Sequence, residues 1–203
     1  MCATTTKVGA KDKMIVSAIE LFKKNGVDGV SVKDICDSAG VTRNAFYYHF
    51  QSKELLFDFI GDYVSMKSKA GIRPLYGCNS YYQQLWEFYR AYIMTEIEMG
   101  ADIMNHVCLS RTMKGRADYF SYIDDKLAER MITLINLAKE SGQVYNPSSA
   151  EDLLWTSYSI IRGVNIKWCF QWGECDILKE SIESLDTLFV PANGFKLIDV
   201  KDE

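Results

Sequence analysis

The sequence predicts an all-α protein, and three observations support this fold class. Apolar residues recur at intervals of three and four along most of the chain, which is the period of an amphipathic helix. Convincing strands, with alternating polar and apolar residues, are not apparent. Ser, Thr or Asp precedes several of the periodic segments and Gly follows several, as expected for helix caps. These segments predict about nine helices.

The first helix is expected to end at Gly26, a residue type that commonly terminates helices. Lys23 and Lys24 lie in its last turn, where cations interact favourably with the helix dipole. Its apolar stripe consists of Met14, Ile15, Ala18, Ile19 and Phe22.

Two short helices joined by a tight turn follow. Ser31 is a good N-cap, and Asp34 three residues later completes a capping pattern. Gly40 stands where the chain must turn sharply, because glycine accepts a positive φ without steric cost. Thr42 is placed to cap the second helix. This arrangement is typical of a helix-turn-helix unit, which places one helix in the major groove of DNA.

The second of these helices carries two different faces. Phe46 and Phe50 are four residues apart and share a face that should be buried. The opposite face holds Arg43, Asn44, Tyr47 and Tyr48. Arginine can contact guanine with two hydrogen bonds and asparagine can contact adenine in the same way. The start of this helix is therefore predicted to read DNA bases.

Phosphate contacts are expected around the same unit. The Tyr47 hydroxyl and the Lys53 ammonium suit phosphate oxygens. The backbone N–H groups of Ser31, Val32 and Lys33 lie at a helix N-terminus, which favours an anion.

At these residues the chain resembles the tetracycline-repressor (TetR/AcrR) family of transcriptional regulators. The resemblance covers about residues 10–58 and is carried by two runs, IVSAIELFKKNGVDGVSVKDI and ICDSAGVTRNAFYYHFQSKELL. It implies DNA reading by Thr42, Arg43, Asn44 and Ala45, backbone contacts by Tyr47, Tyr48, His49 and Lys53, and a phosphate clamp by Ser31 and Lys33. Cys36 departs from the family pattern, which usually has alanine there.

Each of these residues also has a simpler interpretation. Tyr47 and Tyr48 can be packed aromatics, although two adjacent large side chains cannot both point inward on one helix. His49 can lie at the edge of the core, and Arg43 and the lysines can be solvated surface charges.

The sequence predicts two domains, a helix-turn-helix DNA-binding domain at residues 8–56 and a helical bundle for ligand binding and dimerisation at 57–203. A helix from Ser52 to about Gly71 is expected to belong to both domains, so it can carry a signal from the second domain to the first. The later helices are expected at residues 80–99, 101–113, 116–140, 149–172 and 176–190.

The last two expected helices carry more apolar surface than one side of a small bundle needs, so they are predicted to form a homodimer interface. A dimer of this kind needs a palindromic operator to use both recognition helices. The alternative is that the same stripes only close the core of the monomer. The interface residues expected are Leu154, Ile161, Trp168, Trp172, Ile182, Leu185 and Phe189.

An effector pocket is expected in the second domain, because pockets are mostly apolar and aromatic with a few placed polar groups. Glu96 is a candidate for recognising a cation and Arg162 for recognising an anion. The alternative is that the aromatics are plain core and the charges reach solvent. The candidate residues are Trp86, Tyr89, Ile93, Glu96, Tyr122, Tyr158, Arg162 and Asn165.

The formal net charge of the 203 residues is −4, yet the charge is divided unevenly. Residues 1–60 hold eight Lys and Arg against seven Asp and Glu, a net of +1, which leaves 15 against 20, a net of −5, in the remainder. DNA affinity should therefore depend on a few placed contacts rather than on a strongly basic field. No secretory signal and no apolar run long enough to span a membrane is apparent, so a cytoplasmic protein without membrane partners is expected.

Catalysis, metals and cofactors are not expected. The chain lacks a glycine-rich phosphate loop after a strand and a recognisable nucleophile-base set. Six cysteines are scattered without C-x-x-C spacing and only two histidines are present, so no zinc site is apparent. The sequence thus predicts a homodimeric, effector-responsive repressor. The alternatives are a non-specific architectural DNA-binding protein and a thiol-redox-sensing regulator that uses Cys169 and Cys175.

Overall fold

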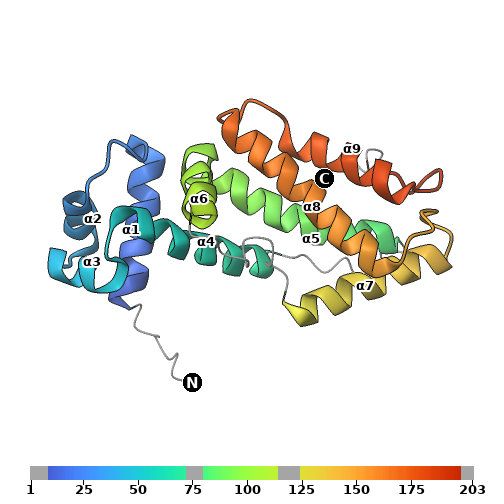
Figure 1. Ribbon diagram of the computed structural model, residues 1–203, viewed down its shortest axis with the longest axis horizontal. Coiled ribbons are helices and arrows are strands. Elements are labelled where there is room, and N and C mark those ends of the chain that lie inside the picture. The colour runs from blue at the N-terminus through green and yellow to red at the C-terminus, as the bar shows by residue number, and fades with distance from the viewer. Residues whose placement is uncertain (1–8, 72–79, 114–123, 198–203) are drawn as a thin grey trace, which may run out of the picture.

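A computed structural model describes residues 9–71, 80–113 and 124–197, and over these residues the chain is helical (Figure 1). Extended pairing in these ranges is limited to an isolated bridge between Val144 and Pro191. The predicted all-α class is confirmed. The helices are α1 (Ala10–Asn25), α2 (Val32–Ala39), α3 (Arg43–Phe50), α4 (Lys53–Ala70), α5 (Tyr81–Met99), α6 (Ala101–Met113), α7 (Asp125–Glu140), α8 (Ala150–Phe170) and α9 (Ile177–Phe189).

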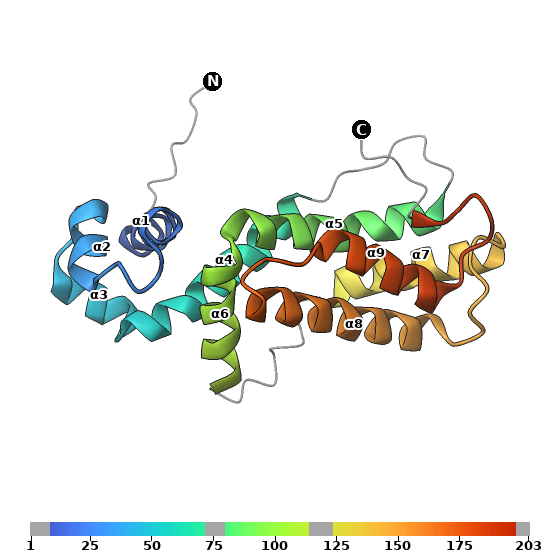
Figure 2. The ribbon, with the colours of Figure 1, turned by 90° about the horizontal axis from the view of Figure 1, so that it is seen from above.

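The helices form two groups that share α4. Helices α1 to α3 gather at one end of the molecule, and α5, α7, α8 and α9 form an elongated bundle at the other (Figures 1 and 2). Helix α6 stands across the junction between the groups and packs on α4 and α8 (Figure 2). The domain boundary predicted after residue 56 falls inside α4, which continues through it without a break.

The smaller group has an apolar core that explains its compactness. Phe46 and Phe50 of α3 are buried, as the helical spacing predicted, and their rings lie 5.1 Å apart. Phe22 of α1 stacks on Phe57 of α4 with ring centroids 5.4 Å apart. Ile35 of α2 is also fully buried. Since α4 contributes Phe57 to this core, the helix-turn-helix unit and α4 move together.

Helix α6 contacts the smaller group of helices, including the first turns of α4, at its start, in its middle and near its end. At its start, Asp102 Oδ2 accepts a hydrogen bond of 2.9 Å from the backbone N–H of Val27. In its middle, the His106 ring stacks on Phe57 with centroids 5.1 Å apart. Near its end, the Ser110 hydroxyl donates to Asp58 Oδ1 at 2.7 Å. Helix α6 is thus bonded both to α4 and to the turn between α1 and α2.

The Arg111 side chain of α6 lies close against α4 at Gly61. Arg111 of α6 is buried there and its Nη2 donates to Asp62 Oδ1 at 2.9 Å. A Cβ added at Gly61 would lie 2.5 Å from Arg111 Nη2, closer than real atoms come. Glycine at position 61 is therefore what lets the guanidinium lie flat against α4.

Buried side chains of α8 and α9 correct the predicted dimer interface. Five of the seven residues expected there face the inside of their own bundle, and Trp172 and Ile182 alone of the seven keep some surface. The error has a physical cause: the strongest apolar stripe of α8 is the one that packs on α6, α7 and α9. The five buried residues are Leu154, Ile161, Trp168, Leu185 and Phe189.

Within the described ranges, no helix combines sufficient length with sufficient apolar character to cross a bilayer.

Gly61→Ala should destabilise the protein, although a glycine-to-alanine change inside a helix ordinarily gains about 1 kcal/mol. The added methyl group would push Arg111 away from Asp62 and leave a buried guanidinium poorly paired. We expect a net loss of about 1–3 kcal/mol in the free energy of unfolding, measured by urea denaturation. The matched control makes the same Gly61→Ala change in an Arg111→Gln background, where the side chain that the methyl group displaces is shorter, and there it should cost less. An equal effect of Gly61→Ala in both backgrounds would show that Arg111 does not depend on Gly61.

Candidate DNA interface and effector cavity

The start of α2 is fixed by a reciprocal capping box. The Ser31 hydroxyl donates to Asp34 Oδ2 at 2.6 Å, and the backbone N–H of Asp34 donates to Ser31 Oγ at 3.3 Å. The Ser31 backbone N–H donates to the same carboxylate at 2.9 Å. These bonds from Ser31 hold the pKa of Asp34 below its usual value.

This capping box corrects the predicted phosphate clamp. Both the hydroxyl and the backbone N–H of Ser31 donate hydrogen bonds to Asp34. The anion site at this helix start is therefore reduced to the N–H groups of Val32 and Lys33. Lys33 is exposed, and its ammonium pairs with Asp37 Oδ2 at 2.6 Å, which raises the lysine pKa.

The turn between α2 and α3 has the predicted geometry. Gly40 adopts the left-handed conformation with φ 66° and ψ 38°. The Val41 N–H donates to the carbonyl of Cys36 at 3.0 Å, which closes the end of α2. Thr42 then caps α3 by accepting a hydrogen bond of 3.2 Å from the Ala45 N–H. The two helices are therefore held at a defined angle by local bonds.

The outer surface of α3 carries the side chains that were predicted to meet DNA. Arg43 and Asn44 are exposed in its first turn. Tyr48 is 83% exposed and Tyr47 is 49% exposed, and the Tyr47 ring meets the buried Phe46 edge-on. Thr42 is exposed beside them and Ala45 is half-buried. The geometry agrees with a DNA-reading surface, and contact with bases stays a prediction.

Two residues that were predicted to contact the DNA backbone, His49 and Lys53, are not placed for such a contact. His49 is half-buried on the flank of α3 away from Tyr47 and lines a groove with Asp58 and Asp62, whose charges oppose an approaching phosphate. The Lys53 ammonium turns inward and donates to the carbonyl of Val27 at 2.6 Å. It also lies 5.7 Å from the centre of the Phe22 ring. We therefore assign Lys53 a structural role between α4 and the turn after α1.

A cavity of about 40 Å³ lies where the last turn of α4 meets α5, α7 and α8. Tyr89 and Tyr158 line it, as predicted for the effector site. Trp86 and Ile93 instead pack in the core, and Tyr122 lies outside the described residues. The lining residues that the sequence interpretation missed are Ser65, Ser68, Lys69, Phe88, Tyr92, Leu127, Met131 and Ile161.

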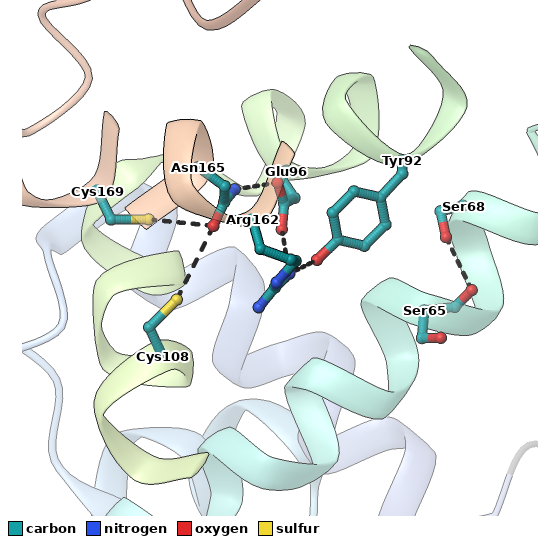
Figure 3. A network of polar contacts seen from close by, with 8 residues as sticks. All are labelled: Ser65, Ser68, Tyr92, Glu96, Cys108, Arg162, Asn165 and Cys169. Atoms are coloured by element: carbon teal, nitrogen blue, oxygen red, sulfur yellow. Dashed lines mark hydrogen bonds and ion pairs between the residues drawn. The ribbon is translucent and has the colours of Figure 1, made fainter. Parts of the chain in front are cut away.

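Beside this cavity, three predicted effector residues form a buried network with each other (Figure 3). Arg162 Nη1 lies 3.5 Å from Glu96 Oε1, and Asn165 donates to the other oxygen of Glu96. Arg162 also donates to the hydroxyl of Tyr92, which lies between Arg162 and Ser68 of α4 in Figure 3. The prediction that Glu96 binds a cation and Arg162 an anion is thus wrong, because each serves as the partner of the other.

Desolvation dominates the electrostatics of this network. Burial raises the pKa of Glu96 to about 8, and the opposing effect of the Arg162 charge is smaller. The Tyr92 pKa is raised well above its usual value for the same reason. Tyr92 and Glu96 are four residues apart on α5, and Arg162 and Asn165 are three apart on α8. This spacing of polar residues on two apolar helices was the available signal for the network.

The same network holds two of the cysteines. The thiols of Cys108 and Cys169 approach Asn165 Oδ1 at 4.0 and 3.9 Å. A hydrogen bond with Cys108 and burial raise the Cys169 pKa, which makes this thiol a poor nucleophile. The neighbour of Cys169 is thus Cys108, whereas the redox alternative required Cys175. In the described ranges, no cluster of three or more His, Cys, Asp or Glu side chains is arranged to hold a metal ion.

Comparison with known proteins supports the interpretation of the N-terminal unit. Residues 15–59 match the family described as "Bacterial regulatory proteins, tetR family". The chain is 34% identical over 86 residues to the "Biofilm operon icaADBC HTH-type negative transcriptional regulator IcaR" of Staphylococcus aureus (strain Newman). It is 37% identical over 57 residues to the "HTH-type transcriptional repressor KstR2" of Rhodococcus jostii (strain RHA1). The matches cover 38% and 28% of this chain and 45% and 28% of the relatives, so the chain spans less than half the length of each.

Solved structures show that the similarity of fold extends over nearly the whole chain. Thermus thermophilus FadR, a TetR-family repressor solved in complex with lauroyl-CoA, superposes with a TM-score of 0.63 at 18% identity, covering 95% of this chain and 97% of that one. AibR, solved with isovaleryl coenzyme A and operator DNA, superposes with a TM-score of 0.55 at 17% identity, covering 91% and 100%. The relatives named above are transcriptional regulators, in agreement with the expectation that this chain is not an enzyme.

Glu96→Gln should change how stability depends on pH. The folded state raises the Glu96 pKa to about 8 from 4.5, so the folded protein binds this proton more tightly than the unfolded chain. The stabilisation from that proton is complete below the ordinary pKa and is lost as the pH rises towards 8. Wild-type stability should therefore fall from about pH 5 to about pH 9, and the variant should fall less.

Urea denaturation at several pH values measures this difference. Glu140→Gln, which changes an exposed carboxylate at the end of α7, is the matched control and should follow the wild-type profile. Parallel profiles for wild type and Glu96→Gln would contradict a protonated Glu96 in the folded state.

Proposed function

We propose that this chain is a homodimeric repressor of the tetR family, whose model its residues 15–59 match. The proposal includes a palindromic operator and a small-molecule effector that releases the protein from it. The observation that carries it is the helix-turn-helix surface, where Arg43 and Asn44 are exposed in the first turn of a recognition helix whose back is locked into the core by Phe46 and Phe50.

Base reading follows from the position of these two side chains. The first turn of a recognition helix reaches base edges in helix-turn-helix proteins, and arginine and asparagine make bidentate contacts there. Tyr47 and Tyr48 flank them with hydroxyl groups suited to phosphate oxygens. The surface is small and nearly neutral overall, so specificity is expected to come from these contacts.

The proposal of a homodimer is supported by a face of α8 that the described residues leave uncovered. Trp155 is 49% exposed and Phe170 is 61% exposed near the two ends of the helix. Ser159 and Gly163 lie on the same face between them, and no atom comes within 4 Å of the Cβ position of Gly163. Two large side chains flanking two small ones give a surface on which a second α8 can lie closely. Partly exposed Ile182 of α9 extends this face.

The effector is proposed to act through the cavity and α4. Three residues of the last two turns of α4 line the cavity, while the first turns of the same helix hold the DNA-reading unit through Phe57. A ligand that binds better to one setting of α4 than to another shifts the spacing of the two recognition helices. The complexes of FadR with lauroyl-CoA and of AibR with isovaleryl coenzyme A support a small molecule with an apolar part as the effector class.

The first experiment is fluorescence anisotropy of the full chain with DNA from upstream of its own gene, scrambled DNA and two salt concentrations. Tight binding of one dimer to the native segment alone is expected. Equal, salt-sensitive binding to both DNAs would replace the proposal with a non-specific architectural protein. A second titration with candidate effectors then tests release.

Arg43→Ala should weaken binding to the cognate DNA by about 1–3 kcal/mol per half-site and relax the preference at one base position. The reason is the loss of a bidentate contact, which non-specific DNA does not offer. Competition anisotropy against operator variants measures both effects. Tyr48→Phe is the control, because the loss of a phosphate contact from this exposed hydroxyl should weaken binding to all sequences alike. An equal loss on all sequences for Arg43→Ala would mean that α3 lies differently on DNA.

Gly163→Arg should weaken the dimer at least about tenfold, or about 1.4 kcal/mol, because it fills the close approach between two α8 helices with a charged side chain. The fold should tolerate it, since the position is open and arginine favours helices more than glycine does. Sedimentation velocity over a range of concentrations measures the dimer, and circular dichroism checks the fold. Thr133→Arg, on the exposed side of α7, is the matched control. An unchanged dimer would remove α8 from the interface.

A further inference from the structure

The walls of the cavity define the chemistry that it presents to a ligand. Four aromatic rings line it, from Phe88, Tyr89, Tyr92 and Tyr158. Two of these residues use their hydroxyl groups within the protein, since Tyr89 shares a hydrogen bond of 2.5 Å with Ser157 and Tyr92 accepts from Arg162. The rings therefore offer mainly apolar surface. Such walls suit a body that is aromatic or aliphatic.

Lys69 is the charged residue among the described residues that line the cavity. Its side chain is 40% exposed in the last turn of α4, so the ammonium lies at the mouth rather than in the interior. The nearest buried carboxyl, Glu96, is held behind Tyr92 by Arg162 and Asn165. The cavity thus presents the Lys69 ammonium to a ligand, whereas the Glu96 carboxyl group is kept away from that ligand.

A carboxylate of the protein already occupies the position in front of Lys69. Asp124 Oδ2 lies 2.9 Å from the Lys69 ammonium. The other oxygen, Oδ1, accepts a hydrogen bond of 2.9 Å from the Leu127 N–H and so caps α7. The pair joins the end of α4 to the start of α7 across the mouth of the cavity. Its partners are both substantially exposed, and exposed pairs of this kind contribute little to stability.

We propose that the cavity binds an amphipathic carboxylate, with its apolar body between the aromatic rings and its carboxylate on Lys69 in place of Asp124. This inference rests on the proposed function and names the class of effector. The cavity of about 40 Å³ has room for only a few water molecules, so the ligand must part its walls. When the ligand carboxylate replaces Asp124 on Lys69, the ion pair between α4 and α7 is lost, and this lets the end of α4 move.

The neighbouring charges agree with this exchange. The C-terminal end of α4 disfavours an anion, and the N-terminal end of α7, which lies at the same mouth, favours one. Asp124 keeps its cap on α7 after it loses Lys69, because that cap uses the other oxygen. The ligand therefore breaks one contact between helices without unravelling either helix.

The test uses three probes with one apolar body and different head groups: 4-phenylbutyrate, its primary amide and 4-phenylbutylamine. Isothermal titration calorimetry on the full chain without DNA measures binding. We expect 4-phenylbutyrate to bind at least about tenfold more tightly than the other two, as a charge-assisted contact predicts. Equal binding of the amide or the amine, or no saturable binding of any probe, would overturn the proposal.

Variants at the mouth separate the head-group contact from general packing. Lys69→Gln should abolish the preference for 4-phenylbutyrate over its amide, and Lys179→Gln, which removes an exposed lysine of α9, should leave it unchanged. Asp124→Asn keeps an N-cap residue and removes the competing charge, so it should tighten 4-phenylbutyrate binding. Weaker or unchanged binding to Asp124→Asn would contradict the exchange of partners.

Operator binding in the presence of 4-phenylbutyrate is measured separately. Binding that depends on Lys69 without release of operator DNA would uphold the carboxylate site and contradict effector release. If other compounds release the operator DNA, and Lys69→Gln does not change that release, the proposed function stands and the carboxylate site is overturned.

Discussion

The unbroken course of α4 is the constraint on which the rest of the structure depends. One helix contributes Phe57 to the core of the helix-turn-helix unit, Gly61 to the close contact with α6, and Ser68 and Lys69 to the cavity wall. A helix transmits displacement along its length because its backbone hydrogen bonds resist bending. The proposed cavity and the DNA-reading unit are thereby joined by one continuous helix.

Helix α6 makes this coupling stronger by holding α4 at several points. Asp102 reaches the turn after α1, Ser110 reaches Asp58, and Arg111 lies on Gly61. Its other side packs on α8, the helix that carries the proposed dimer face. Any repacking of the bundle that shifts α6 therefore has two routes to the recognition helix, one through α4 and one through the Val27 turn.

The buried network around Glu96 gives the larger group of helices a polar centre whose rearrangement costs free energy. A buried carboxyl whose pKa rises to about 8 can exchange its proton near neutral pH, whereas Arg162 remains charged. Because each polar group of the network serves another, it fixes α5 against α8 and supplies a rigid wall for the cavity. Movement in response to a ligand is then left to α4 and α7, whose tie is exposed and weak.

The interface and cavity illustrate where inference from sequence failed. The apolar stripe of α8 was identified correctly, but periodicity alone does not say whether a stripe meets its own chain or a second one. Leu154 and Ile161 turned inward, and the exposed face proved to be the one with Trp155, Ser159 and Gly163. Likewise, Glu96 and Arg162 were noticed as unusual polar residues, but their mutual pairing depends on how α5 and α8 are packed.

The sequence by itself determined the all-α class, the capping of α2 and α3, the turn at Gly40 and the exposed face of the recognition helix, whereas the helix expected at 116–140 begins at Asp125, and residues 116–123 lie outside the described ranges. All of these depend on interactions between residues within about four positions of each other, which the linear order displays directly. Only the tertiary structure decided the partner of Lys53, the pairing of Glu96 with Arg162, the contact of Arg111 with Gly61 and the position of Lys69 at the cavity mouth. These depend on contacts between segments 26 to 66 positions apart, and such contacts are set by packing of whole helices rather than by local preference.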